Sequence, residues 1–371
     1  MTLPPADALG PPAPRTHGTA VEHTVWQQDD VDPGAVEQAM IALERERSQR
    51  RRGVLPARAL NLVVVVDADY TGEIVRRLDA VGRNAPSRTV LVRVHGHRRG
   101  LSARVTLSTI HEGTPDEASS ELVTLDVAQR HLTRLDSIVD PIVLTDVPTL
   151  LWAPHGHVDA LESLGTLGQT VLLDTADAAD YTAGLDAAQG LIDDHGLSIV
   201  DLSWLRATPW RLRLASHYEP PARRGELWSI ADVQIRHQPG SETAAWLFLG
   251  WLADRLGWTP EHGRTRDASG AEVGLRLSPV DVGVQGLAGA TVTSRAGAVF
   301  SLDRNRGGLR AGRTDVYAAV GEHTSTERHW TVLGASRGEA GVLGRALRRT
   351  LVPDDGYIGA LATARRLLSC T

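Results

Sequence analysis

Lysine is absent from this sequence of 371 residues, so arginine supplies all 39 of its basic side chains. The absence excludes a lysine Schiff base and the phosphate-binding lysine of a Walker motif. Arginine remains available for anions, because its planar guanidinium matches phosphate and carboxylate groups. Since alanine, glycine and arginine are all abundant, we interpret the missing lysine mainly as a consequence of genome composition.

Cysteine and long apolar runs are also scarce. Cys370 is the single cysteine, which excludes an intrachain disulfide and a cysteine-rich zinc site. No apolar run approaches the roughly 18 residues that a membrane-spanning helix needs, and the first residues lack the pattern of a signal peptide. The net charge of −6 argues against a surface built for nucleic acid or anionic membrane. We therefore expect a cytoplasmic protein that binds neither.

The composition and the hydrophobic periodicity of the sequence change twice along the chain. Residues 1–31 are rich in proline and alanine and have little periodicity, which predicts a disordered tail. Over residues 32–200, strand-like apolar runs alternate with helical stretches, which predicts an α/β domain with a mostly parallel sheet and flanking helices. Over residues 201–371, strands joined by glycine-containing turns predict an α+β domain with an antiparallel sheet.

Several elements can be placed more closely. Asp32 can cap a helix that begins at the next residue, and Thr208 can cap another. Segment 126–139 predicts a helix and segment 141–146, "PIVLTD", a short strand. Segment 241–258 is apolar nearly all round, which predicts a buried helix.

One short segment resembles a catalytic motif. In "LNLVVVVDADYTG" a buried strand ends in Asp67 and Asp69, as in a haloacid-dehalogenase-type phosphatase, and Thr145 could supply the strand-end hydroxyl of such an enzyme. The lysine that this chemistry normally uses is missing, and no Gly-Asp-x-x-x-Asp string follows. We favour helix capping by these aspartates, and we keep a sugar-phosphate phosphatase as the alternative.

Other site patterns are incomplete. His95 and His97 would share one face of a strand, and His155 and His157 lie in an expected loop, but neither pair has a further ligand at metal-binding spacing. A Gly-x-Ser-x-Gly nucleophile elbow is not present. "DADYTG" stands where a dinucleotide-binding domain has its glycine-rich turn. We therefore expect no metal, no cofactor and no catalytic residue.

Tryptophan is the residue that stands out, with nine copies against two of phenylalanine. Trp152, Trp204 and Trp210 fall in two short segments that also contain proline. Tryptophan buries a large area and keeps one N–H donor, and together with arginine it is enriched at the centres of protein interfaces. A packed corner between domains, a protein contact and a sugar platform all remain open at this point.

These two segments carry a family resemblance. "DLSWLRATPWR" (201–211) and "TDVPTLLWAP" (145–154) resemble the glucose-6-phosphate dehydrogenase assembly protein family, also called OpcA. Further pieces of the same pattern follow in order over residues 55–365: "NAPSRTVLVR" (84–93), "YEPP" (218–221), "LGWLADRLGW" (249–258) and the Tyr-x-x-Ala-Leu string that begins at Tyr357. The family often has two adjacent tryptophans where this chain keeps Trp152 alone, and "DADYT" is not part of the shared pattern.

The resemblance implies a non-catalytic protein with an N-terminal and a C-terminal region. It implies that the partner is glucose-6-phosphate dehydrogenase of the oxidative pentose phosphate pathway, and that binding favours the active oligomer or conformation of that enzyme. The same residues are then the family site, either as a partner contact or as a structural corner: Asp146, Pro148, Trp152, Pro154, Asp201, Trp204, Arg206, Thr208, Pro209, Trp210 and Arg211.

Overall fold

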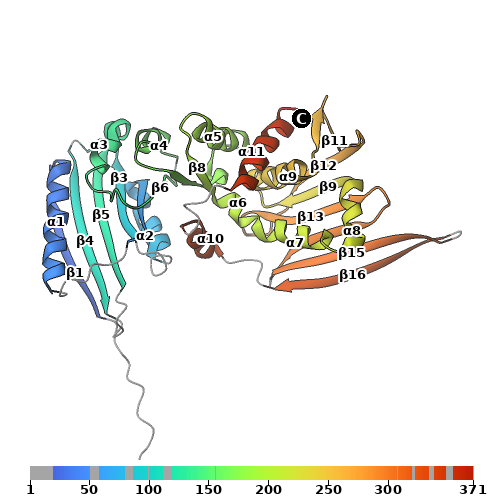
Figure 1. The fold of residues 1–371 in the computed structure, drawn as a ribbon, viewed down its shortest axis with the longest axis horizontal. Coiled ribbons are helices and arrows are strands. Elements are labelled where there is room, and N and C mark those ends of the chain that lie inside the picture. Colours follow the sequence, from blue (N-terminus) through green and yellow to red (C-terminus); the bar gives the residue numbers. More distant parts are fainter. Residues whose placement is uncertain are drawn as a thin grey trace, which may run out of the picture.

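The structure of the chain is a computed structural model, and it describes residues 20–50, 58–79, 87–98, 100–111, 118–154, 156–306, 308–319, 322–333, 338–347 and 354–370. Two eight-stranded sheets lie next to each other along the longest axis of the molecule, each with its own helices (Figure 1). The α/β class expected from the sequence is confirmed.

The first sheet has the strand order β1-β4-β5-β3-β2-β6-β7-β8. Its six strands from β5 to β8 run parallel, and β4 and β1 add to one edge in antiparallel orientation. The apolar run of β2 is buried over nearly its whole length, as in a strand covered on both faces. The strands are β1 Ala20–Gln28, β2 Leu60–Asp67, β3 Ser87–His95, β4 Ser102–His111, β5 Ala118–Ala128, β6 Thr149–Trp152, β7 Thr170–Leu173 and β8 Ser198–Asp201.

The helices of this part follow the strands. They are α1 Pro33–Arg50, α2 Thr71–Asp79, α3 Leu135–Val139, α4 Val158–Leu164 and α5 Tyr181–Asp193, with the 3-10 segments η1 Ala68–Tyr70, η3 Gln129–Arg134 and η4 Thr175–Asp177. The predicted cap of α1 is confirmed, because Asp32 Oδ1 accepts the backbone N–H groups of Gly34 at 2.9 Å and Ala35 at 3.3 Å.

Buried charges fasten α1 to the sheet. Glu121 on β5 is almost fully buried and accepts from Arg47 of α1 at 2.6 Å, from Arg58 at 2.5 Å and from Arg88 of β3 at 3.0 Å. Arg88 also bonds Glu44 of α1 at 2.5 Å. Because Glu121 has three arginine partners, and Arg58 and Arg88 each bond both Glu44 and Glu121, the pairing offsets part of the desolvation that burial costs.

The predicted tail is wrong in part. Residues 20–28 form β1, which pairs with β4 over nine positions. An edge strand with exposed side chains needs no apolar periodicity, so no pattern in these residues predicts it. The first 19 residues of the predicted tail lie outside the described residues.

Two further elements differ from prediction. The expected helix 126–139 begins as the last part of β5 and becomes η3 and α3 only afterwards. The expected strand 141–146 is a series of turns. There the Asn61 side-chain amide donates to the Leu144 carbonyl at 2.8 Å, and its oxygen accepts the Leu144 backbone N–H at 3.0 Å. A side chain thus takes the bonds that a neighbouring strand would have made.

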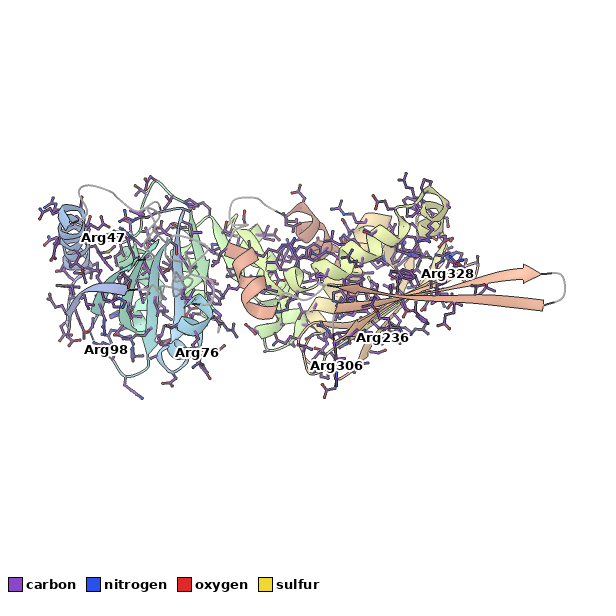
Figure 2. All side chains as sticks on the ribbon, turned by 90° about the horizontal axis from the view of Figure 1, so that it is seen from below. Arg47, Arg76, Arg98, Arg236, Arg306 and Arg328 are labelled. Carbon is purple, nitrogen blue, oxygen red and sulfur yellow. The ribbon has the colours of Figure 1, made fainter. Side chains whose placement is uncertain are left out.

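The second sheet has the order β10-β11-β12-β9-β13-β14-β15-β16. It is antiparallel as expected, except that β12 and β9 pair in parallel. The paired strands β15 and β16 extend beyond the rest of the domain (Figure 2). The strands are β9 Ile230–His237, β10 Thr259–Glu261, β11 Arg264–Arg266, β12 Glu272–Pro279, β13 Leu287–Ser294, β14 Val299–Asn305, β15 Gly308–Ala319 and β16 Glu322–Leu333.

The remaining helices lie between the sheets or over one face of the second sheet (Figure 1). They are α6 Leu202–Arg206, α7 Thr208–Tyr218, α8 Pro221–Arg224, α9 Glu242–Leu256, α10 Gly338–Leu347 and α11 Asp355–Leu368, with the 3-10 segment η5 Gly225–Ser229. The predicted buried helix over 241–258 is confirmed as α9.

Two hydrophobic cores meet at α9 and α11. Leu247 of α9 belongs to the core of the first sheet, whereas its neighbours Phe248 and Leu249 belong to the core of the second. Likewise Tyr357 of α11 packs in the first core and Leu367 in the second. The sheets divide near the predicted boundary at residue 200, but the last helix returns to the first core.

Close packing of α9 on α11 depends on one glycine. A Cβ at Gly250 would lie 2.2 Å from the carbonyl oxygen of Ala360 and 2.8 Å from the backbone nitrogen of Ala364, and both of these atoms belong to the backbone. The two helices must therefore move apart to accept any side chain at this position.

We predict that Gly250→Ala lowers the free energy of unfolding by about 1–3 kcal/mol, because it overpacks this contact. Gly190→Ala on α5 is the matched control, because a Cβ there meets only the end of the Asp194 side chain at 3.7 Å. It should raise stability by about 0.5–1 kcal/mol through helix propensity. Urea denaturation measures both, and equal effects at the two glycines would contradict the proposed contact.

Candidate functional site

Two aspartates at the carboxyl ends of β7 and β8 bind the segments that follow these strands. Asp201 Oδ1 accepts the backbone N–H of Ser203 at 2.9 Å and of Thr175 at 3.3 Å, and its Oδ2 accepts the Thr175 hydroxyl at 2.8 Å. Asp174 accepts the Ser203 hydroxyl at 2.6 Å and pairs with Arg206 at 2.6 Å. Each aspartate thus holds the segment after the other strand, so the two strand ends are cross-linked.

Burial changes the acidity of this cluster. It raises the pKa of Asp201 to about 7, with a further contribution from the nearby Asp174 carboxylate, while the hydrogen bonds from Thr175 and Ser203 oppose the rise. Burial and Asp174 also raise the pKa of Asp177 to about 6. The pKa values of these carboxyl groups therefore lie near neutrality.

Trp204 on α6 joins this cluster to the last helix. Its ring is buried, and its indole N–H donates to Asp354 at 2.9 Å, the residue that caps α11. The Arg211 guanidinium carbon lies 3.2 Å from the ring centroid on one side, and Tyr357 makes an edge contact at 5.8 Å. We call Asp174, Asp201, Trp204, Arg211 and Asp354 the Trp204 junction.

The rest of the 201–211 segment leads into the second core. Pro209 stands in the first turn of α7, and Trp210 is buried among the residues of that core. Arg211 is buried and donates to the Trp204 carbonyl at 2.9 Å and to the Thr208 hydroxyl at 3.2 Å. Thr208 makes no cap of α7, contrary to prediction, because its hydroxyl serves Arg211 instead.

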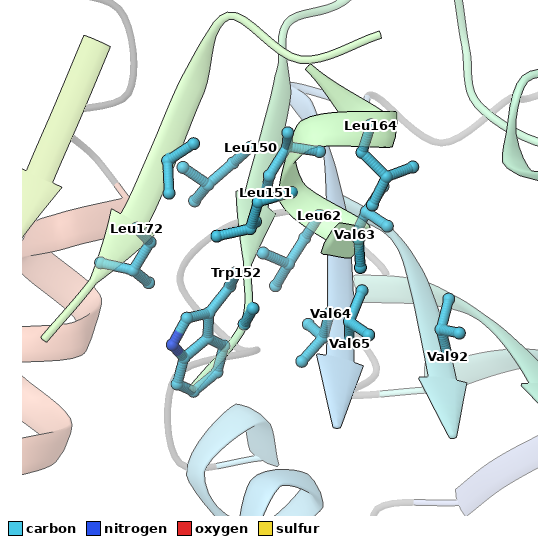
Figure 3. Packing of buried hydrophobic residues seen from close by; sticks show 14 of the residues in the cluster. Leu62, Val63, Val64, Val65, Val92, Leu150, Leu151, Trp152, Leu164 and Leu172 are labelled. Carbon is cyan, nitrogen blue, oxygen red and sulfur yellow. The ribbon is translucent and has the colours of Figure 1, made fainter. Parts of the chain in front are cut away.

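The predicted residues of the 145–154 segment lie on the first sheet. Trp152 ends β6 and is 1% exposed, within the cluster that includes Leu151 and Leu172 (Figure 3). The Pro148 carbonyl accepts the backbone N–H of Asn61 near the start of β2, Pro154 is buried, and Asp146 is exposed in a turn. Trp152 shares the first hydrophobic core with Trp204, but none of these four residues bonds the Trp204 junction directly in the described structure.

Reasoning from the sequence missed two members of the junction, Asp174 and Asp354, and also Thr175, which bonds Asp201. Asp174 and Thr175 follow "TVLL" just as Asp201 follows "SIV", and an aspartate directly after a strand was the available signal. Asp354 gave no such signal, because its bond to Trp204 spans 150 positions of sequence.

The residues of the phosphatase hypothesis are not brought together. Asp67 ends β2 and pairs with His157 at 3.2 Å. Thr145 precedes β6, whose first residue lies beside Asn61 at the opposite end of β2. Over the seven residue steps from position 60 to position 67 a strand rises roughly 23 Å, so the hydroxyl and the aspartate stand near opposite ends of β2.

The histidine pairs do not form a metal site within the described residues. His95 bonds Asp126 at 2.6 Å, and His97 is exposed. His155 lies outside the described residues. Across the part of the chain that the structure covers, no three His, Cys, Asp or Glu side chains are grouped to hold a metal ion, and no helix there has the length and apolarity to cross a bilayer.

We predict that Trp204→Phe lowers the free energy of unfolding by about 1–3 kcal/mol, because the half-buried Asp354 carboxylate loses the indole donor of a buried ring. Trp228→Phe is the matched control, because Trp228 is 64% exposed. Guanidinium or urea unfolding, followed by circular dichroism, distinguishes them. A Trp204→Phe protein as stable as the control would show that this bond contributes little.

A second prediction concerns pH. The pKa of Asp201 rises from 3.8 to about 7 on folding, so the folded chain holds this proton more tightly than the unfolded chain does. Its contribution to stability is therefore full below about pH 4 and is lost as the pH rises to about 7. Asp201→Asn should remove this dependence, so that the stability of the wild type relative to the variant falls over that range. Parallel stability curves from pH 4 to 8 would contradict the raised pKa.

Comparison with protein-family models gives two matches in sequence order. Residues 78–190 match the glucose-6-phosphate dehydrogenase subunit N-terminal domain, and residues 197–361 match the C-terminal domain of the same subunit. The first model ends within α5 and the second begins just before β8, a few residues ahead of the segment that carries the Trp204 junction.

Similar proteins come from cyanobacteria. The chain is 27% identical to the OxPP cycle protein OpcA of Nostoc punctiforme over 191 residues, which are 50% of this chain and 41% of that protein. It is 29% identical to the OpcA protein of Synechococcus elongatus over 159 residues, 42% of this chain and 35% of that one. The matched part thus covers about two fifths or less of these relatives.

Among solved structures, the fold is similar to that of glucose-6-phosphate 1-dehydrogenase from Mycobacterium avium. The TM-score is 0.50 and the sequence identity 11%, with 84% of this chain and 91% of that one covered. Such a likeness concerns the fold alone. The two family models, which follow each other along most of the described chain, and the cyanobacterial relatives show that this chain belongs to the OpcA family of glucose-6-phosphate dehydrogenase subunits.

Proposed function

We propose that this chain binds glucose-6-phosphate dehydrogenase and favours the active conformation or oligomer of that enzyme, without chemistry of its own. The observation that carries the proposal is the pair of family models, both described as domains of a glucose-6-phosphate dehydrogenase subunit. The OxPP cycle named for the relatives gives the pathway in which such a partner would act.

The start of α2 supports a role without a dinucleotide cofactor. A parallel α/β sheet of the dehydrogenase type binds a dinucleotide where strand order reverses, with a glycine-rich turn before a helix N-terminus. In this sheet β2 lies between β3 and β6, which places that point after β2. Asp67 and Asp69 occupy the turn, and Asp67 pairs with His157. Carboxylates there repel a pyrophosphate, so these residues do not fit a dinucleotide.

The proposed effect on the partner is a shift of population. A protein that binds one state of an enzyme more tightly than the others raises the share of that state. Moving a two-state enzyme from 1:99 to 99:1 takes about 5.5 kcal/mol of differential affinity. A protein interface of ordinary size with a few well-packed aromatic and arginine side chains can supply this amount.

The Trp204 junction serves in this proposal as the structural connection between the two sheets. Trp204, Trp210 and Arg211 are each less than one tenth exposed, so they are not available to a partner that binds this conformation. By joining α6, α7 and α11, they fix the surfaces that the two domains present. The partner contact must then come from exposed side chains.

We propose Trp228 on η5 as one such contact, because an aromatic ring that is 64% exposed gains most from being covered. The segment that carries Trp228 is held in place by ion pairs and hydrogen bonds. Glu226 on the same segment bonds Arg313 of β15 through two contacts of 2.9 and 3.0 Å, and Arg313 also donates to His217 Nε2 at 2.9 Å. A side chain on a preordered support loses little entropy on binding.

His217 completes that support. Its ring stacks on Phe300 at 3.7 Å. Burial lowers the pKa of His217 to about 4, with further contributions from Arg223 and Arg313. The imidazole is therefore neutral at pH 7 and can accept the Arg313 N–H.

The test of the function mixes the purified protein with the dehydrogenase of the same organism. We expect the two to elute together on size exclusion, and we expect the rate of NADP⁺ reduction to change when the protein is added, whereas the protein alone gives no reduction. Co-elution without a rate change would indicate a purely structural subunit. Separate elution at tens of micromolar, with an unchanged rate, would contradict the proposal.

The contact at Trp228 has its own prediction. Trp228→Ala should weaken binding of the dehydrogenase at least about tenfold, as the truncation of a central interface tryptophan does. Tyr70→Ala is the control, because Tyr70 is also an exposed aromatic residue but lies on the first domain. Titration by fluorescence anisotropy measures both affinities. Equal affinities of the two variants would exclude Trp228 while leaving the function itself intact.

A further inference from the structure

The strand β16 is the outermost strand of the second sheet, and one of its two edges is free. The strand order ends at β16, which pairs with β15 over all of its 12 residues. In an antiparallel pair the backbone groups of a strand point alternately toward the neighbouring strand and away from it. About half of the N–H and C=O groups of β16 therefore point outward, and within the described residues no strand pairs with them.

The opposite edge of the same sheet is protected against a further strand, whereas this edge is not. β10 has 3 residues and contains Pro260, which has no N–H to donate. β16 is long and contains no proline. Beyond Thr314, where the pairing with β14 ends, β15 and β16 pair only with each other (Figure 2). A two-stranded ribbon is only marginally stable in water, so a third strand adds to its stability.

Trp330 gives this edge an exposed apolar contact. The side chain is 41% exposed, and its ring centroid lies 6.5 Å from that of His217 and 6.3 Å from that of Phe300. His217 bonds Arg313, which in turn bonds the segment that carries Trp228. Trp330 therefore packs against an ordered support on one side and is open on the other. An aromatic ring that is ordered before binding loses little entropy when a partner covers it.

Arg328 gives the same edge a positive charge. It is exposed and lies opposite Arg313 in the pair of β15 with β16. Arg313 bonds both Glu226 and Asp315, whereas Arg328 forms no ion pair with any residue that the structure describes. Because Arg328 and Trp330 are two positions apart on a strand, their side chains lie on the same face of the sheet. A strand added to β16 meets both of them.

A second copy of the chain does not suit this edge. Residues opposite each other in an antiparallel pair point to the same face, so two copies of β16 related by a two-fold axis must set one residue opposite itself. The two registers that overlap nearly the whole strand set Glu327 opposite Glu327, or Arg328 opposite Arg328. Like charges directly opposite each other are destabilising. These charges favour a strand from another molecule.

We infer that β16 binds an extended segment of the dehydrogenase as a further strand of the second sheet. The inference rests on the proposed function, because it takes the partner from there. The main chain of that segment pairs with the outward groups of β16. Its side chains set an apolar group against Trp330 and, two positions away, an acidic group against Arg328. In such strand addition the main-chain bonds give affinity and the side chains at alternate positions give specificity.

Hydrogen exchange measured by mass spectrometry, on the chain alone and with the dehydrogenase, tests the inference. We expect the outward amides of residues 322–333 to exchange at least about tenfold more slowly in the complex. The edge strand β1, residues 20–28, is the control and should exchange equally in both samples. A complex without protection of β16 overturns the inference and leaves the proposed function standing, whereas two proteins that do not bind overturn both.

Protection of β16 in the chain alone that grows with its concentration would identify a second copy as the occupant. That result would overturn the inference of a strand from the dehydrogenase, and sedimentation velocity would show the dimer directly.

Two variants test the side-chain contacts. Trp330→Ala and Arg328→Glu should each weaken binding of the dehydrogenase at least about tenfold, because they remove the apolar and the charged contact. Val25→Ala is the control for the first, because Val25 is 44% exposed on the edge strand β1. Arg310→Glu is the control for the second, because Arg310 is exposed on β15 but points to the opposite face of the sheet.

Fluorescence anisotropy measures the four affinities, and near-ultraviolet circular dichroism confirms that each variant folds. If Trp330→Ala and Arg328→Glu bind the dehydrogenase as tightly as their controls do, the segment does not lie along β16 and the inference is wrong.

Discussion

The cross-linking of β7 and β8 by their two terminal aspartates is the constraint on which the rest of the molecule depends. Asp174 and Asp201 hold the point where the chain leaves the first sheet, and Trp204, three residues later, reaches the cap of the last helix. The direction of α6 and α7 toward the second core follows from these bonds. So does the position of α11, which packs in both cores. The junction thereby sets how the domains connect.

Burying carboxyl groups at such a place has an energetic consequence. A buried carboxylate is expensive unless it is paired, and here the guanidinium of Arg206 bonds Asp174, whereas hydrogen-bond donors from the backbone and Thr175 serve Asp201. The raised pKa of Asp201 shows that these donors only partly offset its desolvation. A chain that needed only stability would place apolar groups there. The directional bonds of the carboxylates fix the path of the backbone, which apolar packing alone does less sharply.

Much of the fold could be predicted because local signals suffice for it. The buried run of β2, the cap at Asp32 and the all-round apolar helix α9 are each decided by neighbours in sequence. The incorrect predictions share one cause, which is that each element depends on residues far away in the sequence. β1 is a strand only because β4 lies beside it, and segment 141–146 is a turn only because Asn61 bonds Leu144. The motif drew attention to Asp201, Trp204 and Arg211, but not to Asp174 or Asp354, and the bond of Trp204 to Asp354 joins residues 150 positions apart.

The burial of the motif also bears on how a binding protein is recognised. The buried tryptophans and arginines of the motif have partners within the chain, as Trp204 has in Arg211. Residues with such internal partners recur at fixed spacing, so a sequence pattern can reveal them. Contact residues have their partners on another molecule, so no spacing within this chain reveals them. Such residues must be found by their exposure and by the contacts that hold their segment in place, as for Trp228. If the proposed binding role holds, the residues of the sequence motif form the internal framework, and the function lies in the exposed surfaces that this framework positions.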